Sequence, residues 1–258
     1  MNEESHGIII TGAAGGIGSA TIARLAGAAS IRIGLLDMDA EAIDRLVAHY
    51  ADAPCHMIPL PCDLQDAISI AAAIDRFAES GPIDTLFANA GIMTAPDAFE
   101  TIDAAAIDRS LAVNLRAVTL CTRLAWPHFR SGSAHVIVNA SGAGRHPLAS
   151  DPVYSAAKAG AIMFARACAA RRNETGIRFN ALAPGVVDTP ILRDPRTGEW
   201  RGEVRDFAGE YQLIDPDEIA VAALRLMDDP DLNDQLVSIA NRRRDTPPST
   251  TPAPSRNA

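Results

Sequence analysis

Short apolar segments alternate with segments of helical periodicity along most of this 258-residue chain. The apolar segments have the length of buried strands, and the segments between them are long enough to connect parallel strands. This order predicts an α/β fold: a Rossmann-like, doubly wound parallel sheet in a single domain, with ligands at the carboxyl ends of the strands. The expected strands are 7–11, 31–37, 56–60, 83–88, 134–140 and 177–183, and the expected helices are 16–28, 39–50, 66–79, 103–130 and 153–173.

A glycine-rich turn, Thr11-Gly-Ala-Ala-Gly-Gly-Ile-Gly18, joins the first expected strand to the first expected helix. Glycine allows the backbone to approach a pyrophosphate closely, and the free N–H groups of a helix start bind negative charge. An ordinary strand–helix turn is the alternative interpretation. The strand before the turn and the helix after it favour dinucleotide binding.

The second expected strand ends in Asp37, followed by Met38. A carboxylate at this point accepts hydrogen bonds from the ribose of an adenosine and repels a 2′-phosphate. Met38, Ala14 and Gly15 offer no cation for such a phosphate. The sequence therefore predicts NAD rather than NADP as the cofactor, although Asp37 also suits a cap of the 39–50 helix.

The stretch Tyr154-Ser-Ala-Ala-Lys158 places a phenol and an ammonium on one helix face, and Ser141 directly follows the 134–140 strand. A free phenol has a pKa near ~10, and a neighbouring cation lowers it toward the range useful for proton transfer. These three residues predict acid–base chemistry on an alcohol or carbonyl. A surface pair on an amphipathic helix is the alternative.

Composition restricts the function classes. The chain is 48% hydrophobic and 21% charged, with a net charge of −9, which disfavours nucleic-acid and anionic membrane partners. No apolar run approaches the ~20 residues of a transmembrane helix, and the acidic start Met1-Asn-Glu-Glu does not resemble a secretory leader. We expect a cytoplasmic protein. The four cysteines and six histidines have no metal-binding spacing, so we expect no metal.

The C-terminal third departs from the regular alternation. Residues 190–212 carry several arginines and acids and are expected to form an irregular lid over the site. Asp215-Pro-Asp-Glu218 has the pattern of a helix start, with a helix to about Met227, and 236–240 is expected to be a short strand. We expect one domain over 1–240 that includes the lid, and a disordered tail over 241–258.

With these residues in view, the chain resembles the short-chain dehydrogenase/reductase family over residues 6–227, in its single-domain alcohol/ketone branch. The motifs occur in the family's order: the glycine turn, Asp63-Leu64, Asn89-Ala-Gly91, the Tyr/Lys pair, and Pro184-Gly185 with Thr189. The resemblance implies a catalytic tetrad of Asn114, Ser141, Tyr154 and Lys158. It implies NAD contacts from Gly12, Ala14, Gly15, Gly16, Ile17, Gly18, Asp37, Met38, Asp63, Leu64, Asn89, Ala90, Gly91, Tyr154, Lys158, Pro184, Gly185, Val187 and Thr189.

The resemblance also implies roles and partners. Tyr154 is the expected acid/base, and Ser141 holds the substrate oxygen. Lys158 binds the nicotinamide ribose and, together with the positive ring of NAD⁺, lowers the pKa of Tyr154. Asn114 positions a water that links Lys158 to bulk solvent. The expected substrate is a small-molecule secondary alcohol or ketone. A homo-oligomer, dimer or tetramer, is expected through helices 103–130 and 153–173. The alternatives are a 3-oxoacyl-thioester reductase, and an NAD(H)-binding regulatory protein with vestigial chemistry.

Three features depart from the family's pattern. Asn233-Asp-Gln235 and Asn241-Arg-Arg-Arg244 stand where the family has glycine-containing steps around its last strand, which puts in question the docking of the carboxyl terminus and the tetramer contacts of that segment. The tail beyond Asp245 has no counterpart in the family. The loop after Ser141 is polar, and its Arg145 and His146 are either solvent-exposed charges or contacts for a carboxylate on the substrate.

Overall fold

The computed structural model describes residues 5–94, 99–194 and 196–244, and within them a seven-stranded sheet in the order β3-β2-β1-β4-β5-β6-β7. Every strand pair in this sheet is parallel. The predicted doubly wound, Rossmann-like single domain is therefore confirmed. The strands are β1 (His6–Thr11), β2 (Ile31–Asp37), β3 (His56–Pro61), β4 (Thr85–Ala88), β5 (His135–Asn139), β6 (Arg178–Pro184) and β7 (Leu236–Ile239).

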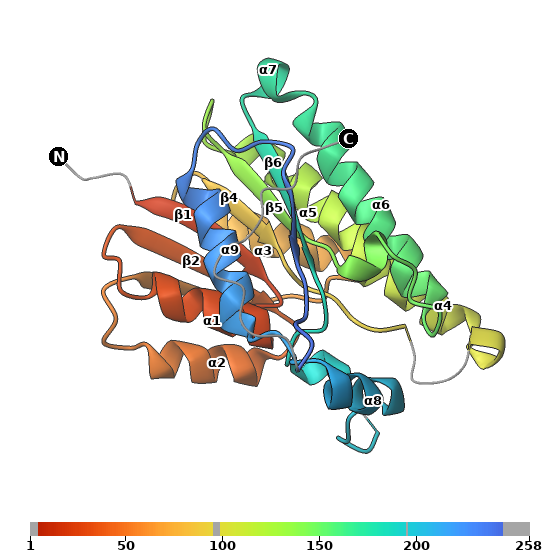
Figure 1. Ribbon diagram of the computed structural model, residues 1–258. Helices are drawn as coiled ribbons and strands as arrows, with labels where there is room; N and C mark the ends of the chain where they lie inside the picture. The colour runs from red at the N-terminus through yellow and green to blue at the C-terminus, as the bar shows by residue number, and fades with distance from the viewer. Residues whose placement is uncertain (1–4, 95–98, 195, 245–258) are drawn as a thin grey trace.

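Helices cover both faces of the sheet (Figure 1). One face carries α1 (Gly16–Leu25), α2 (Ala40–His49) and α9 (Pro216–Asp228), and the other carries α3 (Ala67–Ala78), α5 (Ala117–Ala125) and α6 (Pro152–Ala169). Successive strand residues alternate between the two layers: Ile9 packs in one core, and Ile8 and Ile10 pack in the other. The strands are therefore apolar on both faces, as the uninterrupted hydrophobic runs predicted.

The expected helix 103–130 is divided. It consists of α4 (Ala104–Leu111), a π-helical turn (Ala112–Arg116), α5 and a short 3₁₀ turn (Trp126–His128). In the π-helical turn the Ala117 N–H bonds to the carbonyl of Ala112, five residues earlier. Periodicity did not predict this wider turn, because one extra residue hardly alters a hydrophobic pattern. The helix expected at 153–173 is α6, which ends at Ala169 and is followed by the short α7 (Arg172–Thr175).

The 190–212 segment is less irregular than expected. It contains a 3₁₀ turn (Pro190–Leu192) and α8 (Gly202–Glu210), which lies beyond the carboxyl ends of the strands in Figure 1. The predicted start of α9 is confirmed, because Asp215 and Glu218 form a complete capping box with proline in the first turn. Of the expected tail, residues 241–244 are ordered by hydrogen bonds to other segments, whereas 245–258 lie outside the described residues.

The turn that leads into β7 forms without the glycine that the family has there. Asp234 adopts a positive φ of 57°, the only such non-glycine residue in the described chain. Asn233 anchors the step, because its side chain accepts from the Phe179 N–H at 3.0 Å and donates to the Ala169 carbonyl at 3.1 Å. β7 therefore docks on β6 with Ala181 opposite Leu236, despite the departure from the family's sequence.

The positive φ gives a stability prediction. Asp234→Ala should lower the free energy of unfolding by about 1 kcal/mol relative to Asp234→Gly, because the left-handed conformation penalises a Cβ. Both variants lose the exposed ion pair with Arg166, so their difference isolates the backbone effect. Urea unfolding of the two variants measures it, and equal stabilities would contradict the assignment.

Candidate active site

The predicted site residues gather at the carboxyl edge of the sheet. Thr11 ends β1, Asp37 ends β2 and Pro184 ends β6, while Asn89 follows β4 directly and Ser141 lies two residues after β5. The chain crosses over between β1 and β4, which lie side by side although β2 and β3 intervene in sequence. Such a switch point opens a crevice at the carboxyl ends of the strands.

The glycine turn has no room for side chains at two of its positions. A Cβ on Gly18 would lie 2.2 Å from the Gly12 carbonyl oxygen, and Gly12 has a φ of +64° with Ala90 against it. The turn leads directly into α1, whose N-terminal cap is Gly15 and whose first turn has no side-chain cap and no acid. The first N–H groups of α1 thus remain available for a phosphate, which fits the diphosphate of a dinucleotide.

Asp37 is held beside this turn by two backbone donors. Its carboxylate accepts from the Ala14 N–H at 3.0 Å and from the Asp39 N–H at 3.2 Å. The cap of α2 is Asp39, which accepts from Ala42, so Asp37 does not serve as the helix cap. Met38 is 75% exposed beside it. The carboxylate is thus anchored next to the phosphate turn.

Asp63 and Leu64 follow β3, the neighbour of β2. The Cys62 N–H bonds to the Asp37 carbonyl at 2.8 Å, which brings this segment against the end of β2. Leu64 is buried and Asp63 is exposed, with the Asp63 carboxylate accepting from the Gln65 N–H. The pair therefore extends the edge on which Asp37 lies.

Asn89 connects β4 to the glycine turn. Its side-chain amide donates to the carbonyls of Thr11 and Gly12, and the Thr11 hydroxyl accepts from the N–H groups of Asn89 and Ala90. Gly91 lies against the catalytic candidates, because a Cβ there would be 3.1 Å from both Asn114 Oδ1 and Lys158 Nζ. The Asn-Ala-Gly segment thus joins the glycine turn to the Tyr/Lys pair.

Lys158 is almost fully buried, and its ammonium donates to the carbonyl of Asn139 at 3.0 Å. The side-chain amide of Asn139 in turn donates to Asn89 Oδ1 at 2.9 Å. The Lys158 Nζ lies 5.7 Å from the centre of the Tyr154 ring. One continuous set of hydrogen bonds therefore runs from Thr11 through two asparagines to the candidate lysine.

Burial dominates the titration of both groups. It raises the pKa of Tyr154 to about 12, a rise that the hydrogen bond with Ser141 opposes and the negative charge of Asp151 increases. Burial also lowers the pKa of Lys158 to about 8. The expected depression of the Tyr154 pKa is thus not what the protein alone produces. Loss of water penalises the phenolate more than its polar neighbours stabilise it.

Asn114 lies in the π-helical turn and is completely buried. Its side chain accepts from the Ile92 N–H and donates to the Ile92 carbonyl and to Ser110. Both hydrogens of its amide are thus engaged, one by the Ile92 carbonyl and one by Ser110.

Asp151 is a site residue that the sequence did not suggest. It caps α6 by accepting from the Tyr154 N–H at 2.9 Å, and its other oxygen accepts from the Thr94 N–H at 2.8 Å. The hydroxyl of Thr94 bonds to Ser110, which also bonds to Asn114. The available signal was Asp151-Pro152, a cap followed by proline at the first helical position.

The segment after β6 returns to the glycine turn. A Cβ on Gly16 would lie 2.7 Å from the Thr189 methyl group, so Thr189 lies directly on the start of α1. Val187 is buried and bridges to Ile214. Pro184, Gly185, Val187 and Thr189 belong to one segment, residues 184–189, which we call the nicotinamide loop after the contact that the resemblance leads us to expect.

Two groups of charged residues near the site are engaged with other protein groups. Arg145 donates to Ser238 on β7. In the 190–212 segment Arg193 lies over the Trp200 ring at 5.8 Å, and Arg196 pairs with Asp194. His146 is exposed. Of these three arginines, Arg196 has an acidic partner, whereas Arg145 and Arg193 contact a hydroxyl and an aromatic ring.

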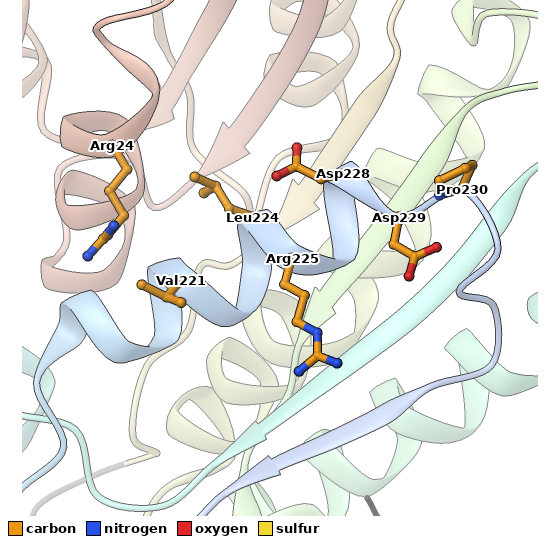
Figure 2. Close-up of a pocket in the computed structure, with 7 residues that line it drawn as sticks. All are labelled: Arg24, Val221, Leu224, Arg225, Asp228, Asp229 and Pro230. Atoms are coloured by element: carbon orange, nitrogen blue, oxygen red, sulfur yellow. The ribbon is translucent and has the colours of Figure 1, made fainter. Parts of the chain in front are cut away.

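A separate open pocket of about 550 Å³ lies between α1 and α9 (Figure 2). Its rim includes Asp229, whose carbonyl accepts from Arg178 at the first residue of β6. The pocket is thus at the amino edge of the sheet, opposite the candidate site. Among the described residues no group of three potential metal ligands occurs, and no helix is long and apolar enough to span a membrane.

Known proteins resemble the chain over most of its length. The family model described as short chain dehydrogenase matches residues 6–200. A cis-4-hydroxycyclohexanecarboxylate dehydrogenase of Sinomonas cyclohexanicum is 36% identical over 224 residues, which cover 86% of this chain and 88% of that protein. The 15-hydroxyprostaglandin dehydrogenase [NAD(+)] of Bos taurus is 30% identical over 254 residues, covering 91% of each chain.

Solved structures resemble the fold. Levodione reductase superposes with a TM-score of 0.80 at 29% identity, covering 91% of this chain and 95% of that one. A short chain dehydrogenase from Burkholderia cenocepacia in complex with NADP has a TM-score of 0.79 at 27% identity, covering 93% and 98%. Proteins similar to this chain thus include a named NAD(+) enzyme and an NADP complex.

The position of Asp151 predicts a change in the Tyr154 pKa. Asp151→Asn should lower that pKa by roughly 0.5–1 unit, because a negative charge near the phenol is removed. Since the chain has three tyrosines, NMR titration of ¹³C-labelled tyrosine resolves each phenol. Asp103→Asn, which alters the cap of α4, is the matched control and should leave Tyr154 unchanged. An unchanged Tyr154 titration in Asp151→Asn would contradict the prediction.

Proposed function

The chain belongs to the short chain dehydrogenase family, and from this premise we propose that it is an NAD-dependent oxidoreductase that interconverts a secondary alcohol and a ketone. One observation carries the proposal. Gly91 brings Asn114 and Lys158 together beside the glycine turn, and the Lys158 ammonium lies 5.7 Å from the ring of Tyr154, whose pKa the Ser141 hydroxyl lowers.

In the proposed complex, each part of the NAD molecule is held by residues whose chemistry suits it. The uncapped start of α1, with Gly12, Gly16 and Gly18, binds the diphosphate, and the anchored carboxylate of Asp37 binds the adenosine ribose. Asp63 and Leu64 flank the adenine, and the nicotinamide loop (184–189) holds the other end. The bound nicotinamide supplies the hydride chemistry; orientation and proton transfer are supplied by the protein.

Tyr154 is the acid/base of the proposed reaction. During alcohol oxidation its phenolate accepts the hydroxyl proton of the substrate, whose oxygen Ser141 holds by a hydrogen bond. With a pKa raised to about 12, the phenol of the protein alone is protonated at neutral pH. Oxidation therefore requires positive charge close to the phenol, and the ammonium of Lys158 provides part of it. Ketone reduction uses the protonated phenol directly as the acid.

The substrate is proposed to be a cyclic or otherwise bulky secondary alcohol or its ketone. Support comes from the Sinomonas relative, whose name gives a hydroxylated cyclohexane ring as its substrate. In the 3-oxoacyl-thioester alternative the arginines of the 190–212 segment attract a phosphopantetheine carrier, and the pairing of Arg196 and Arg205 with acids weakens it. A vestigial NAD(H)-binding role is opposed by the presence of the complete tetrad.

Self-association and a cytoplasmic location stay predictions of the sequence. On α6, Ala157 and Ala161 are fully buried within the chain, and a Cβ on Gly160 would contact Leu115. The exposed residues Ala156, Ala159 and Met163 on this helix support a proposed homo-oligomer contact.

Tyr154→Phe tests the mechanism. It should reduce NAD-dependent oxidation of a panel of secondary alcohols by at least about 10³-fold, because the proton acceptor is removed. NADH binding, measured by fluorescence titration, should persist since the glycine turn and Asp37 are intact. Oxidation at the wild-type rate would refute the role of Tyr154.

Asp37→Ala tests the cofactor preference. The variant should lose affinity for NAD by about tenfold and gain relative affinity for NADP, because the ribose acceptor and the repulsion of a 2′-phosphate disappear together. Titration of wild type and variant with both cofactors measures the ratio. Asp39→Ala, at the neighbouring helix cap, is the control, and tighter NADP binding by the wild type would overturn the assignment of NAD.

A further inference from the structure

The four residues Asn241–Arg244, which we call the C-terminal strap, run from β7 across two segments of the proposed site. Their contacts are hydrogen bonds to groups 29 to 55 residues earlier in sequence, at Val186, Ala208, Glu210 and Gln212. The strap was expected to be the start of a disordered tail. These contacts instead make it a bridge between the nicotinamide loop and α8.

Asn241 fixes the nicotinamide loop. Its side-chain oxygen accepts from the Val186 N–H at 2.8 Å, and its amide donates to the Val186 carbonyl at 2.7 Å. The same amide donates to the Gln212 carbonyl at 2.9 Å. One side chain thus holds both hydrogen-bonding groups of a residue in the middle of the loop and ties them to the segment after α8.

The loop and Asn241 fit closely. A Cβ on Gly185 would lie 2.2 Å from Asn241 Oδ1, so only glycine at 185 permits this approach. Gly185 also donates its N–H to the Ile239 carbonyl at 2.8 Å. Backbone and side chain therefore define the distance between β7 and the loop.

The arginines of the strap hold the end of α8. The Arg244 side chain donates to the Ala208 carbonyl at 2.8 Å, and the backbone N–H of Arg244 donates to the Glu210 carbonyl at 2.9 Å. The Gln212 N–H bonds to the Arg242 carbonyl, and Tyr211 bridges to Arg243. A guanidinium at the carboxyl end of a helix also interacts favourably with its dipole.

We propose that Asn241 is a positioning residue, through which the C-terminal strap sets the place of the nicotinamide loop and α8 and thereby the affinity for cofactor and substrate. This rests on the proposed function, in which the loop contacts the nicotinamide. Asn241 itself does not touch the reacting atoms. Its effect passes through Val186 to Val187 and Thr189.

The first test compares Asn241→Ala with the wild type. The Kd for NADH and the KM for the alcohol should each rise about fivefold to tenfold, while kcat stays within about twofold, because the catalytic residues lie on other elements. Arg76→Ala, which removes an exposed ion pair on α3, is the control and should leave all three constants unchanged. Unchanged Kd and KM in Asn241→Ala, with or without a lower Tm, would overturn the proposal.

A double-mutant cycle tests the contact itself. Gly185→Ala displaces the Asn241 side chain, so it should raise the Kd for NADH about tenfold in the wild-type background. In the Asn241→Ala background the same change should cost at least about threefold less, because the displaced side chain is absent. Additive effects of the two substitutions would contradict the proposed coupling.

Hydrogen exchange separates this inference from the proposed function. In the protein without cofactor, amides of 185–189 and 204–214 should exchange faster in Asn241→Ala and in Arg244→Ala than in the wild type. If the wild type neither binds NADH nor turns over alcohols, the proposed function fails. The exchange data alone still test whether the strap positions the nicotinamide loop and α8. Wild-type exchange rates in both variants would refute it.

Discussion

The site depends on a buried ammonium group for which the described residues supply no carboxylate partner. Lys158 is 3% exposed, and its hydrogen-bond acceptor is the carbonyl of Asn139. A buried charge that is only partly compensated is costly, which is why burial lowers the pKa of Lys158 to about 8. The carbonyl that accepts from Lys158 is held in place by further hydrogen bonds. The Asn139 side chain donates to Asn89, and Asn89 donates to the Thr11 carbonyl at the end of β1. The same loss of water strengthens the electrostatic interaction of Lys158 with any negative charge nearby.

Close backbone approach is the second feature that shapes this edge of the sheet. Gly12 lies on Ala90, Gly16 on Thr189, and Gly185 on Asn241. Each contact joins segments from different strands, so the site is assembled from several loops that leave one another no room for a Cβ. The glycines thus serve two purposes: they open the backbone to a ligand, and they let neighbouring loops support one another. This explains how short connections build a site with several fixed donors and acceptors.

The fold was largely predictable from the sequence, and the site only in part. Uninterrupted apolar runs identified the strands, and Asp215-Pro-Asp-Glu218 identified the start of α9, because both signals are local. Tyr154, Lys158 and the glycine turn were found by spacing. Asp151 was missed because its second contact, with Thr94, lies 57 residues away. The strap was misread as tail because its composition resembles a linker, while its partners are backbone groups that no residue pattern reveals. The burial of Tyr154, which raises the pKa of its phenol in the protein without cofactor, was not predicted because burial cannot be inferred from a helix face.

The π-helical turn at 112–116 lets this helix carry one residue more than a regular helix of the same length. An α-helix advances about 100° per residue, but the Ala112–Ala117 bond holds the extra residue within one wider turn, so α4 and α5 on either side keep their own orientations. Val118 and Cys121 thereby face the core, while Asn114 faces Ile92. Removing a single residue within the turn would close it to a regular helix, which would alter the position of Asn114 while leaving the packing of α5 in place.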